Sequence, residues 1–494
     1  MTEFRPKARR PRGFADRRGA TLARERAIVE KVLGVYEAWG FERLETSAFE
    51  YADALGKFLP DQDRPNEGVF ALTDDDDQWM ALRYDLTAPL ARFVAENYDA
   101  LPKPYRRCAA GPVWRNEKPG PGRFREFWQC DADSVGAPSP AADAEMIAMA
   151  CAALEAAGAS NTVIKISSRG LLDGILTQAG VTDASQRMAA LRAVDKVDRL
   201  SWAGVEQLLG AGRMDESGDY TVGAKLSDEA IRAVMGLLIF ATSTDVVAGS
   251  RKKFLETVWE SGGAENLSSV HAELSTISET LDALGVDDRK ARFDISVVRG
   301  LEYYTGAVFE AELLGETKDE NGNLVRFGSV GGGGRYDDLV SRFKGQPIPA
   351  TGFSVGVSRL AAALTAQEEA RAADGPVVVL PFDASAMGAC MALAAELRGA
   401  FARASVRRAA EVYLGGSGPK AQLKYADKRG SPVAVIVGGD EVRDNTVSIK
   451  NLRLGAEIAA NAEDREAWNK ARENVQVTVP RAEMAATVLK MLAP

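Results

Sequence analysis

The sequence predicts an α+β protein with several domains, whose central sheet is built from two separated segments of chain. Residues 105–135 have the pattern of a strand, a loop rich in glycine and proline, and a second strand, and strand character resumes near residue 292. Between these segments, residues 168–288 are mostly helical and carry no chemical motif, which predicts an insertion. Beyond residue 376, strands and helices alternate as in a small α/β domain.

The first part of the chain predicts helices that flank this sheet. Apolar residues recur at helical spacing over residues 21–39, and an extended segment follows over 41–49. An alanine-rich helix is expected over 141–157, followed by a strand that begins at Thr162. The acidic run 74–77 separates two apolar strands, and we interpret it as the polar turn of a hairpin rather than as a ligand site.

The second part of the chain predicts strands rich in glycine and aromatic residues. VRGLEYYTG (298–306) places an arginine and two adjacent tyrosines at the start of a hairpin. The glycine run 331–334 either forms a turn or lets the backbone approach a ligand closely. GFSVGVSRL (352–360) has the pattern of a strand that runs into a helix, and the charged segment 366–376 has the composition of a linker.

The overall composition is that of a globular protein, with 46% hydrophobic and 27% charged residues. No stretch approaches the ~20 consecutive apolar residues that a membrane helix needs. The arginine-rich N-terminus has no apolar segment behind it, which argues against a secretory signal, and Asp16 and Glu25 argue against a mitochondrial presequence without excluding it. The net charge of −9 leaves a nucleic-acid partner open, because phosphates are bound by local patches.

Two residue types limit the chemistry. The four cysteines form no CxxC pair and no cluster with histidine, which argues against structural zinc and fits the reducing cytosol. The single histidine, His271, lies in a helical stretch, where we expect a surface or core-edge position. A mechanism that needs two histidines is therefore excluded, and carboxylates, arginines, tyrosines and bound metal must carry the chemistry.

The densest group of chemical side chains lies in residues 115–133, RNEKPGPGRFREFWQCDAD. Residues of equal parity share one face of a strand, so Arg123, Arg125, Phe127 and Gln129 are expected to line one side of a pocket. Guanidinium groups suit phosphate and carboxylate oxygens, and a phenylalanine can stack on a base. Taken alone, the segment is also compatible with a charged surface hairpin.

Together these segments resemble the signature motifs of class II aminoacyl-tRNA synthetases. VRGLEYYTG and GGGGRYDDL resemble the two motifs particular to the histidyl-tRNA synthetase family, and PRGFADRR, LRYDLTAPLAR and LKYADKRG fit the same family in the same order. The resemblance covers nearly the whole chain. It implies an antiparallel sheet of six or seven strands flanked by helices, a helical insertion, a C-terminal α/β anticodon-binding domain and a homodimer formed through the first motif.

The resemblance also implies domain boundaries and an activity. The catalytic domain would occupy residues 1–167 and 289–366, the helical insertion 168–288, a linker 367–375, and the anticodon-binding domain 376–494. The protein would be a cytoplasmic ligase. It would activate histidine with ATP and Mg²⁺ to histidyl-adenylate, and then transfer the histidine to the 3′ end of histidine tRNA.

On the nucleotide side, the resemblance assigns roles to residues that match the family's motifs. Arg115 would contact the α-phosphate of ATP and the histidine carboxylate, and Arg299 would lie at the same phosphate, so these two are the candidate catalytic residues. Glu117 would meet the adenine amino group, and Phe127 would stack on adenine. Arg359, in the first turn of a predicted helix, would hold the γ-phosphate.

On the amino-acid side, the resemblance implies two groups of substrate-binding residues. Three side chains would hold the amino group and backbone of the substrate: Asp85, Thr87 and Gln129. Asp133 and Tyr304 would bind the imidazole nitrogens, with Tyr303 nearby. No protein side chain is implied as a metal ligand.

Two other functions share parts of this pattern. The synthetase-like regulatory subunit of ATP phosphoribosyltransferase, in histidine biosynthesis, shares the catalytic fold but normally lacks the anticodon domain and has eroded motifs. Prolyl and threonyl synthetases share the C-terminal module, but VRGLEYYTG discriminates against them. Histidine-dependent exchange between ATP and pyrophosphate separates these functions.

The loop within residues 115–133 departs from the common bacterial form of the family, because Lys118-Pro119-Gly120 replaces arginine-proline-glutamine. In the family this loop helps to read an extra 5′ guanosine on histidine tRNA. Glycine has no side chain for base-edge hydrogen bonds, and lysine lacks the bidentate fork of arginine. We therefore predict weaker dependence on that guanosine than in the common bacterial form, when transcripts with and without it are charged. A large preference for the guanosine form would contradict this prediction.

Overall fold

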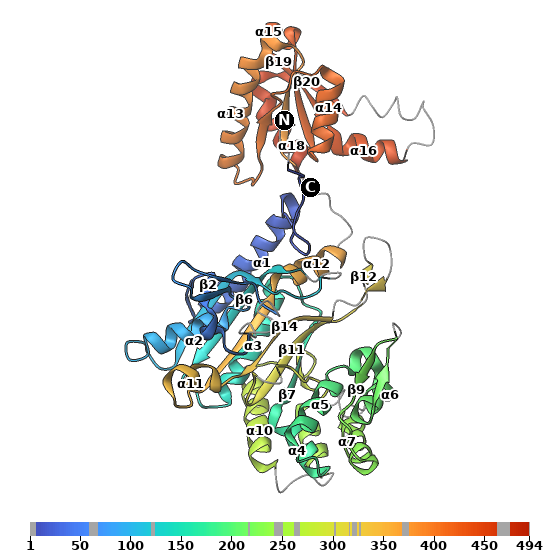
Figure 1. Cartoon of the computed structure of the whole chain (residues 1–494). Helices are drawn as coiled ribbons and strands as arrows, with labels where there is room; N and C mark the ends of the chain where they lie inside the picture. Colours follow the sequence, from blue (N-terminus) through green and yellow to red (C-terminus); the bar gives the residue numbers. More distant parts are fainter. Residues whose placement is uncertain are drawn as a thin grey trace, which may run out of the picture. The chain divides into compact units, whose positions relative to one another are not determined.

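The computed structural model of the chain divides into two compact units, Met1–Glu369 and Ala370–Pro494 (Figure 1). The structure describes the following residues: 6–58, 68–119, 124–215, 218–241, 250–260, 267–300, 303–315, 317–318, 324–325, 328–367, 375–461 and 475–493. Gly120, Arg123 and most of the expected linker lie outside these ranges.

An eight-stranded sheet forms the centre of the first unit, in the order β1-β5-β6-β15-β14-β11-β7-β10. Its six inner strands are antiparallel to one another: β5 (Tyr105–Trp114), β6 (Glu126–Val135), β15 (Ala350–Gly356), β14 (Gly328–Arg335), β11 (Ala307–Leu313) and β7 (Thr162–Ser168). The edge strands β1 (Glu42–Arg43) and β10 (Ala291–Phe293) are short and run parallel to β5 and β7. The expected six or seven antiparallel strands are thus corrected to eight with parallel edges, because long crossover connections reach both edges.

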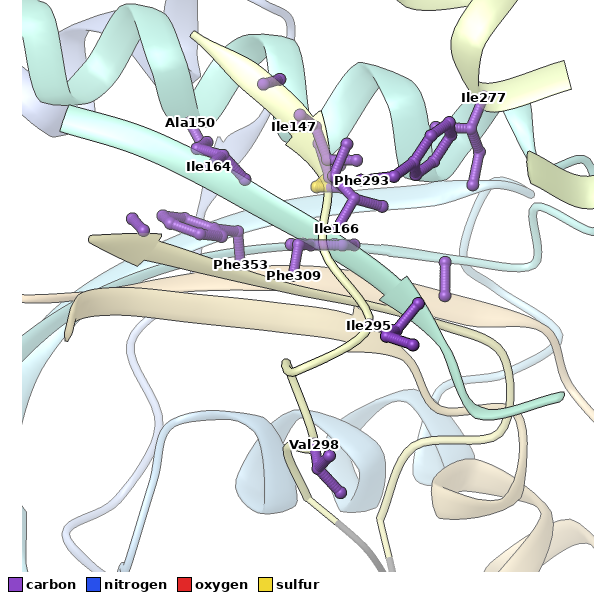
Figure 2. Packing of buried hydrophobic residues seen from close by; sticks show 14 of the residues in the cluster. Ile147, Ala150, Ile164, Ile166, Ile277, Phe293, Ile295, Val298, Phe309 and Phe353 are labelled. Carbon is purple, nitrogen blue, oxygen red and sulfur yellow. The ribbon is translucent and has the colours of Figure 1, made fainter. Parts of the chain in front are cut away.

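One face of this sheet is covered by helices and buries the core. The helices α1 (Gly19–Ala38), α3 (Ala141–Ala156) and α12 (Val357–Gln367) pack on the sheet, and α10 (Ser268–Ala283) packs on α3. Figure 2 shows Ile147 of α3 above Ile166, Phe309 and Phe353 of the strands. The last two rings stack with their centroids 6.1 Å apart.

The opposite face of the same strands is polar. Cys130 and Ala132 of β6 belong to the core, whereas Gln129, Asp131 and Asp133 line a cavity. Successive side chains of a strand point to opposite faces, so this one segment supplies both the core and the site. The glycine run 331–334, for which the sequence left a turn or a close approach to a ligand open, forms half of the inner strand β14.

A smaller three-stranded sheet, in the order β2-β4-β3, follows the first helix. Its strands are β2 (Phe49–Tyr51), β4 (Trp79–Leu82) and β3 (Ala71–Thr73), and the expected acidic turn joins β3 to β4. The Asp74 carboxylate accepts backbone N–H groups of Asp76 and Gln78, which confirms the turn. Three short helical elements accompany this sheet: η1 (Ala52–Phe58), α2 (Thr87–Glu96) and α11 (Asp338–Lys344).

The segment between β7 and β10 is helical, as expected. Its helices are α4 (Arg169–Gln178), α5 (Ala184–Val194), α6 (Val197–Leu209), α7 (Asp228–Ala241), α9 (Arg251–Glu260) and α10. The sequence did not predict the hairpin of β8 (Gly212–Met214) and β9 (Tyr220–Val222), because three-residue strands are too short to display a period. His271 of α10 is half-buried against Trp259, 4.6 Å between ring centroids, which confirms its core-edge position.

Two further hairpin strands of the first unit are β12 (Thr317–Lys318) and β13 (Leu324–Val325).

The second unit is built on a five-stranded sheet in the order β17-β16-β18-β19-β20. Its strands are β16 (Val377–Pro381), β17 (Ala410–Val412), β18 (Val433–Val437), β19 (Thr446–Asn451) and β20 (Gln476–Pro480). Its helical elements are η3 (Ala384–Ala386), α13 (Met387–Arg403), α14 (Pro419–Lys428), α15 (Gly439–Asp444), α16 (Leu452–Asn461), η4 (Arg481–Glu483) and α18 (Met484–Leu492). This unit has its own hydrophobic core, as the predicted α/β pattern requires. No helix in the described ranges combines the length and apolar character that crossing a membrane requires.

A buried ion pair joins β14 to α3. The Arg335 guanidinium donates to the Asp143 carboxylate over 2.6 Å and 3.0 Å, and the carboxyl side chain is fully buried. We predict that Arg335→Met lowers the free energy of unfolding by about 3–5 kcal/mol, because it leaves a buried carboxylate without its cation. Urea unfolding measures this change. Lys290→Met, which breaks the exposed pair with Glu155, is the control and should leave the unfolding midpoint unchanged.

Candidate active site

A cavity of about 810 Å³ lies on the polar face of the first unit's sheet. Its walls come from β6, β11, β14 and β15, from the starts of α2 and α12, and from the segment that precedes β11. Eleven residues to which the sequence assigned roles line this one cavity: Asp85, Thr87, Arg115, Glu117, Phe127, Gln129, Asp133, Arg299, Tyr303, Tyr304 and Arg359. The tertiary structure therefore brings together residues that are up to 274 positions apart in the sequence.

Arg115 is held between two aromatic rings. Its guanidinium carbon lies 4.3 Å from the centre of the Tyr84 ring and 5.1 Å from that of Phe127. The Tyr84 hydroxyl donates to the Glu117 carboxylate over 3.0 Å, and burial raises the pKa of Tyr84 to about 12, so the hydroxyl keeps its proton at neutral pH. The stacking fixes the plane of the guanidinium group. Tyr84 was not assigned a role from the sequence.

Arg299 reaches the cavity from the segment before β11 and is anchored by β11 and β14. Its Nη2 donates to the Glu310 carboxylate over 2.7 Å and to the Ser329 hydroxyl over 2.6 Å. Burial of Glu310 opposes its ionisation, but the neighbouring Arg299 outweighs this and lowers the pKa of the carboxyl. A Cβ at Gly332 would lie 2.2 Å from Nη1 of Arg299, so the guanidinium group crosses β14 where only a glycine leaves room.

Asp133 is fixed from two sides on the cavity floor. One carboxylate oxygen pairs with the Arg107 guanidinium at 3.1 Å, and the other accepts a hydrogen bond from the Tyr336 hydroxyl. Arg107 is 1% exposed and also donates to the Leu86 carbonyl over 2.6 Å. The sequence missed Arg107, because two adjacent arginines at the start of an otherwise mostly apolar strand carry no motif. Tyr336 lies within GGGGRYDDL and could have been found from its position.

Asp131 is a second buried carboxylate on this floor, one step along the same face of β6. Burial, together with the nearby charge of Asp133, raises the pKa of Asp131 to about 7. Its Oδ1 and the Oε1 of Gln129 have no hydrogen-bond partner among the described residues. The Nε2 of Gln129 donates to the Ser354 hydroxyl over 2.9 Å. The floor therefore offers acceptor oxygens to a ligand rich in donors.

Two other parts of the cavity wall are the start of α2, which a carboxylate caps, and a pair of packed tyrosine rings. Asp85 accepts the backbone N–H groups of Thr87 and Ala88 over 3.1 Å and 2.8 Å, which satisfies the first free donors of α2. Tyr303 and Tyr304 lie edge to face, with their ring centroids 5.1 Å apart. Both tyrosines line the cavity.

The parity prediction for the hairpin strand was only partly right. Phe127 and Gln129 line the cavity, but Arg125 does not. Its Nε donates to the Glu117 carbonyl over 2.9 Å, and its guanidinium lies 5.9 Å from the Phe70 ring centre. The alternation fails there because β6 begins at Glu126, so Arg125 still belongs to the loop.

The carboxylates of the cavity do not build a metal site of their own. Asp85 caps α2, Asp133 is paired with Arg107, and Glu310 is paired with Arg299. Within the described ranges, no three histidine, cysteine or acidic side chains gather that could hold a metal ion. Magnesium commonly binds through substrate phosphates with few protein ligands, so the cavity suits an ion that arrives on ATP.

Comparison with known proteins identifies the class of this site. The model of the histidyl-tRNA synthetase family matches residues 13–360, and the model of the anticodon binding domain matches residues 376–491. With the antiparallel sheet and its arginine-lined cavity, these matches define a class II aminoacyl-tRNA synthetase. The chain belongs to the histidyl-tRNA synthetase family.

A full-length relative and one solved structure support this assignment, and a second solved structure shares the fold. A histidine–tRNA ligase of Caulobacter vibrioides is 58% identical over 99% of this chain and 98% of its own length. The crystal structure of a histidyl-tRNA synthetase from Nostoc has a TM-score of 0.70, with 25% identity, over 99% of this chain and all of that one. A Bacillus halodurans structure described as an ATP phosphoribosyltransferase regulatory subunit/histidyl-tRNA synthetase has a TM-score of 0.65 at 23% identity, covers 88% of this chain and all of that one, and shows the fold alone.

The raised pKa of Asp131 implies that the stability of the folded chain depends on pH. The ordinary value for an aspartate is 3.8 and the folded value is about 7, so the folded chain holds this proton more tightly than the unfolded chain. The contribution of Asp131 to the stability of the wild type therefore falls as the pH rises from about 4 to about 7. We predict that Asp131→Asn has a higher melting temperature than the wild type near pH 8, and that this advantage disappears near pH 4. A less stable variant near pH 8 would mean that Arg107 more than compensates the buried charge.

Proposed function

We propose that this chain activates histidine with ATP and transfers it to the 3′-terminal ribose of histidine tRNA. One observation carries the proposal beyond family membership. Arg115 and Arg299, which are 184 positions apart in the sequence, line one cavity beside a polar floor that holds Asp133. Two fixed cations next to a hydrogen-bonding slot suit the place where a carboxylate meets the first phosphorus of a nucleotide.

The first step is displacement at the α-phosphorus of ATP. A histidine carboxylate oxygen forms the new bond to phosphorus, and the bond to the bridging oxygen breaks, so pyrophosphate leaves with its electron pair. The carboxylate is already ionised, so this step needs no protein base but needs alignment and neutralisation of charge. Arg115 and Arg299 supply the charge at the α-phosphate, and Arg359 supplies it at the γ-phosphate.

The second step forms the ester. The terminal ribose hydroxyl attacks the carbonyl carbon of the adenylate, AMP leaves with the phosphate oxygen, and the hydroxyl proton passes to that leaving group or to water. Neither step needs a histidine of the protein as a base. This agrees with the position of His271, which is not among the residues that line the cavity. Phe127 would stack on the adenine, while the Glu117 carboxylate would accept a hydrogen bond from the adenine amino group.

Recognition of histidine would rest on hydrogen bonds to the imidazole ring. Asp133, fixed by Arg107 and Tyr336, would accept a hydrogen bond from a ring N–H, and the Tyr304 hydroxyl would bind the second nitrogen. Asp85, Thr87 and Gln129 would hold the amino group. A site with such buried partners can reject an analogue that lacks them by roughly 10⁴- to 10⁵-fold, because its polar groups would remain unpaired.

The proposal includes Mg²⁺ carried by ATP, a homodimer and a cytoplasmic location. The regulatory subunit of ATP phosphoribosyltransferase is not favoured, because relatives of matching length are histidine–tRNA ligases and the residues 376–491 match an anticodon binding domain. That domain is the part we expect to contact the anticodon of histidine tRNA.

Arg299→Ala tests the mechanism through histidine-dependent exchange between ATP and pyrophosphate. We expect the exchange rate to fall by about 10²- to 10³-fold, because one preorganised donor at the α-phosphate is lost. Gly332→Ala should also lower the rate, because its new Cβ would displace the same guanidinium group. Arg289→Ala, an exposed arginine paired with Asp287, is the matched control and should exchange at the wild-type rate. Full activity of Arg299→Ala would remove this residue from the mechanism.

A further inference from the structure

The residues that precede the first helix are fixed to the rim of the cavity. We call residues 6–18 the N-terminal arm. The backbone N–H of Arg125 donates to the Gly13 carbonyl over 2.8 Å, and Arg17 donates to the Glu126 carbonyl over 2.9 Å. Arg125 in turn donates to the carbonyl of Glu117, which lines the cavity. The arm is thus joined through one hairpin to the nucleotide side of the site.

Two further contacts hold the anchored part of the arm. The Phe14 ring lies 5.8 Å from the Phe70 ring, between centroids. Gly13 has a φ of +86°, and a Cβ there would lie 2.8 Å from the side chain of Arg125. The chain passes so close to the hairpin that this position needs a glycine. The anchor is therefore a specific packing contact.

The arm carries a concentration of positive charge. Five of its basic side chains belong to exposed residues: Lys7, Arg9, Arg10, Arg12 and Arg18. Its single acid, Asp16, is exposed and lies 3.9 Å from Arg10, a separation at which an exposed pair contributes little. The whole chain has a net charge of −9, so this local excess stands against the overall balance. Phosphate binding depends on such local patches.

We propose that the N-terminal arm binds the sugar–phosphate backbone of tRNA next to its 3′ end. The inference rests on the proposed function, because ester formation requires the terminal ribose to enter the cavity. The nucleotides before it must then cross the rim of the cavity, and Gly13 is attached to that rim through Arg125. Arg12 directly precedes Gly13. Lys7 lies six positions before Gly13, so its Cα is within about 22 Å of the Gly13 Cα even if the chain between them is fully extended.

The chemistry of the arm suits this partner. Arginine presents a fork of donors that matches phosphate oxygens, and proline at positions 6 and 11 restricts the backbone between the cations. Phosphate contacts hold a nucleic acid in register but do not read its sequence. A run of exposed cations is usually a solvated surface without a partner. Here the arm is attached at the cavity rim, and this attachment favours a nucleic acid as its partner.

The triple variant K7A/R9A/R12A tests the proposal in two assays of the same protein. We expect histidine-dependent exchange between ATP and pyrophosphate to stay at the wild-type rate, because none of the three residues lines the cavity. In aminoacylation, we expect the KM for tRNA to rise about tenfold or more near 0.1 M salt. The slope of log kcat/KM against log salt should become shallower by about 2 to 3, because three phosphate contacts are lost.

Two control variants make the result specific. K31A/K103A/K344A removes three cations of exposed residues from the same unit, none of which lines the cavity, and should leave the tRNA KM and the salt slope unchanged. R9K/R12K keeps the charge and should retain tRNA binding near the wild-type level. Equal losses in both triple variants, parallel loss of exchange in the arm variant, or an unchanged tRNA KM and slope would each overturn the proposal. A wild type without histidine-dependent exchange would overturn the proposed function instead.

Discussion

The alternation of side chains along the inner strands is the constraint on which the rest of the structure depends. Along β6, Cys130 and Ala132 face the helices. Asp131 and Asp133, which alternate with them, face the cavity. The packing of α3 on one face therefore fixes the position of the carboxylates on the other face. A one-residue slip of β6 would bury the acids in the apolar core and remove the cavity floor.

Polar groups brought this close to a core need fixed partners. Arg107 pairs with Asp133 from the neighbouring strand, in register across the sheet, and Tyr336 reaches the same carboxylate from the end of β14. Arg299 is held in the same manner by Glu310 and Ser329. Asp133 and Arg299 are thus oriented before a substrate arrives, which lowers the reorganisation that the reaction would require.

The position of Arg299 also explains one glycine of the run, Gly332. A residue with a Cβ at position 332 would collide with the guanidinium group, and the run forms an inner strand with partners on both sides. Glycine costs conformational entropy in a strand, but here the sheet pairs its backbone and the site uses the space. Gly13 likewise leaves room for an arginine side chain, that of Arg125, where the N-terminal arm meets the hairpin beside Glu117.

The sequence by itself determined the fold class, the helical insertion and the residues of the motifs, because strand and helix periods and the quoted motifs are local properties of the chain. It could not determine the parallel edges of the sheet, the β8–β9 hairpin or the direction of Arg125, because these follow from pairing and from where β6 begins. Nor could it find Tyr84, Arg107, Asp131 and Glu310 as parts of the site. Their roles come from partners far away in the sequence, and only the tertiary structure decides which buried charge lies beside which cation.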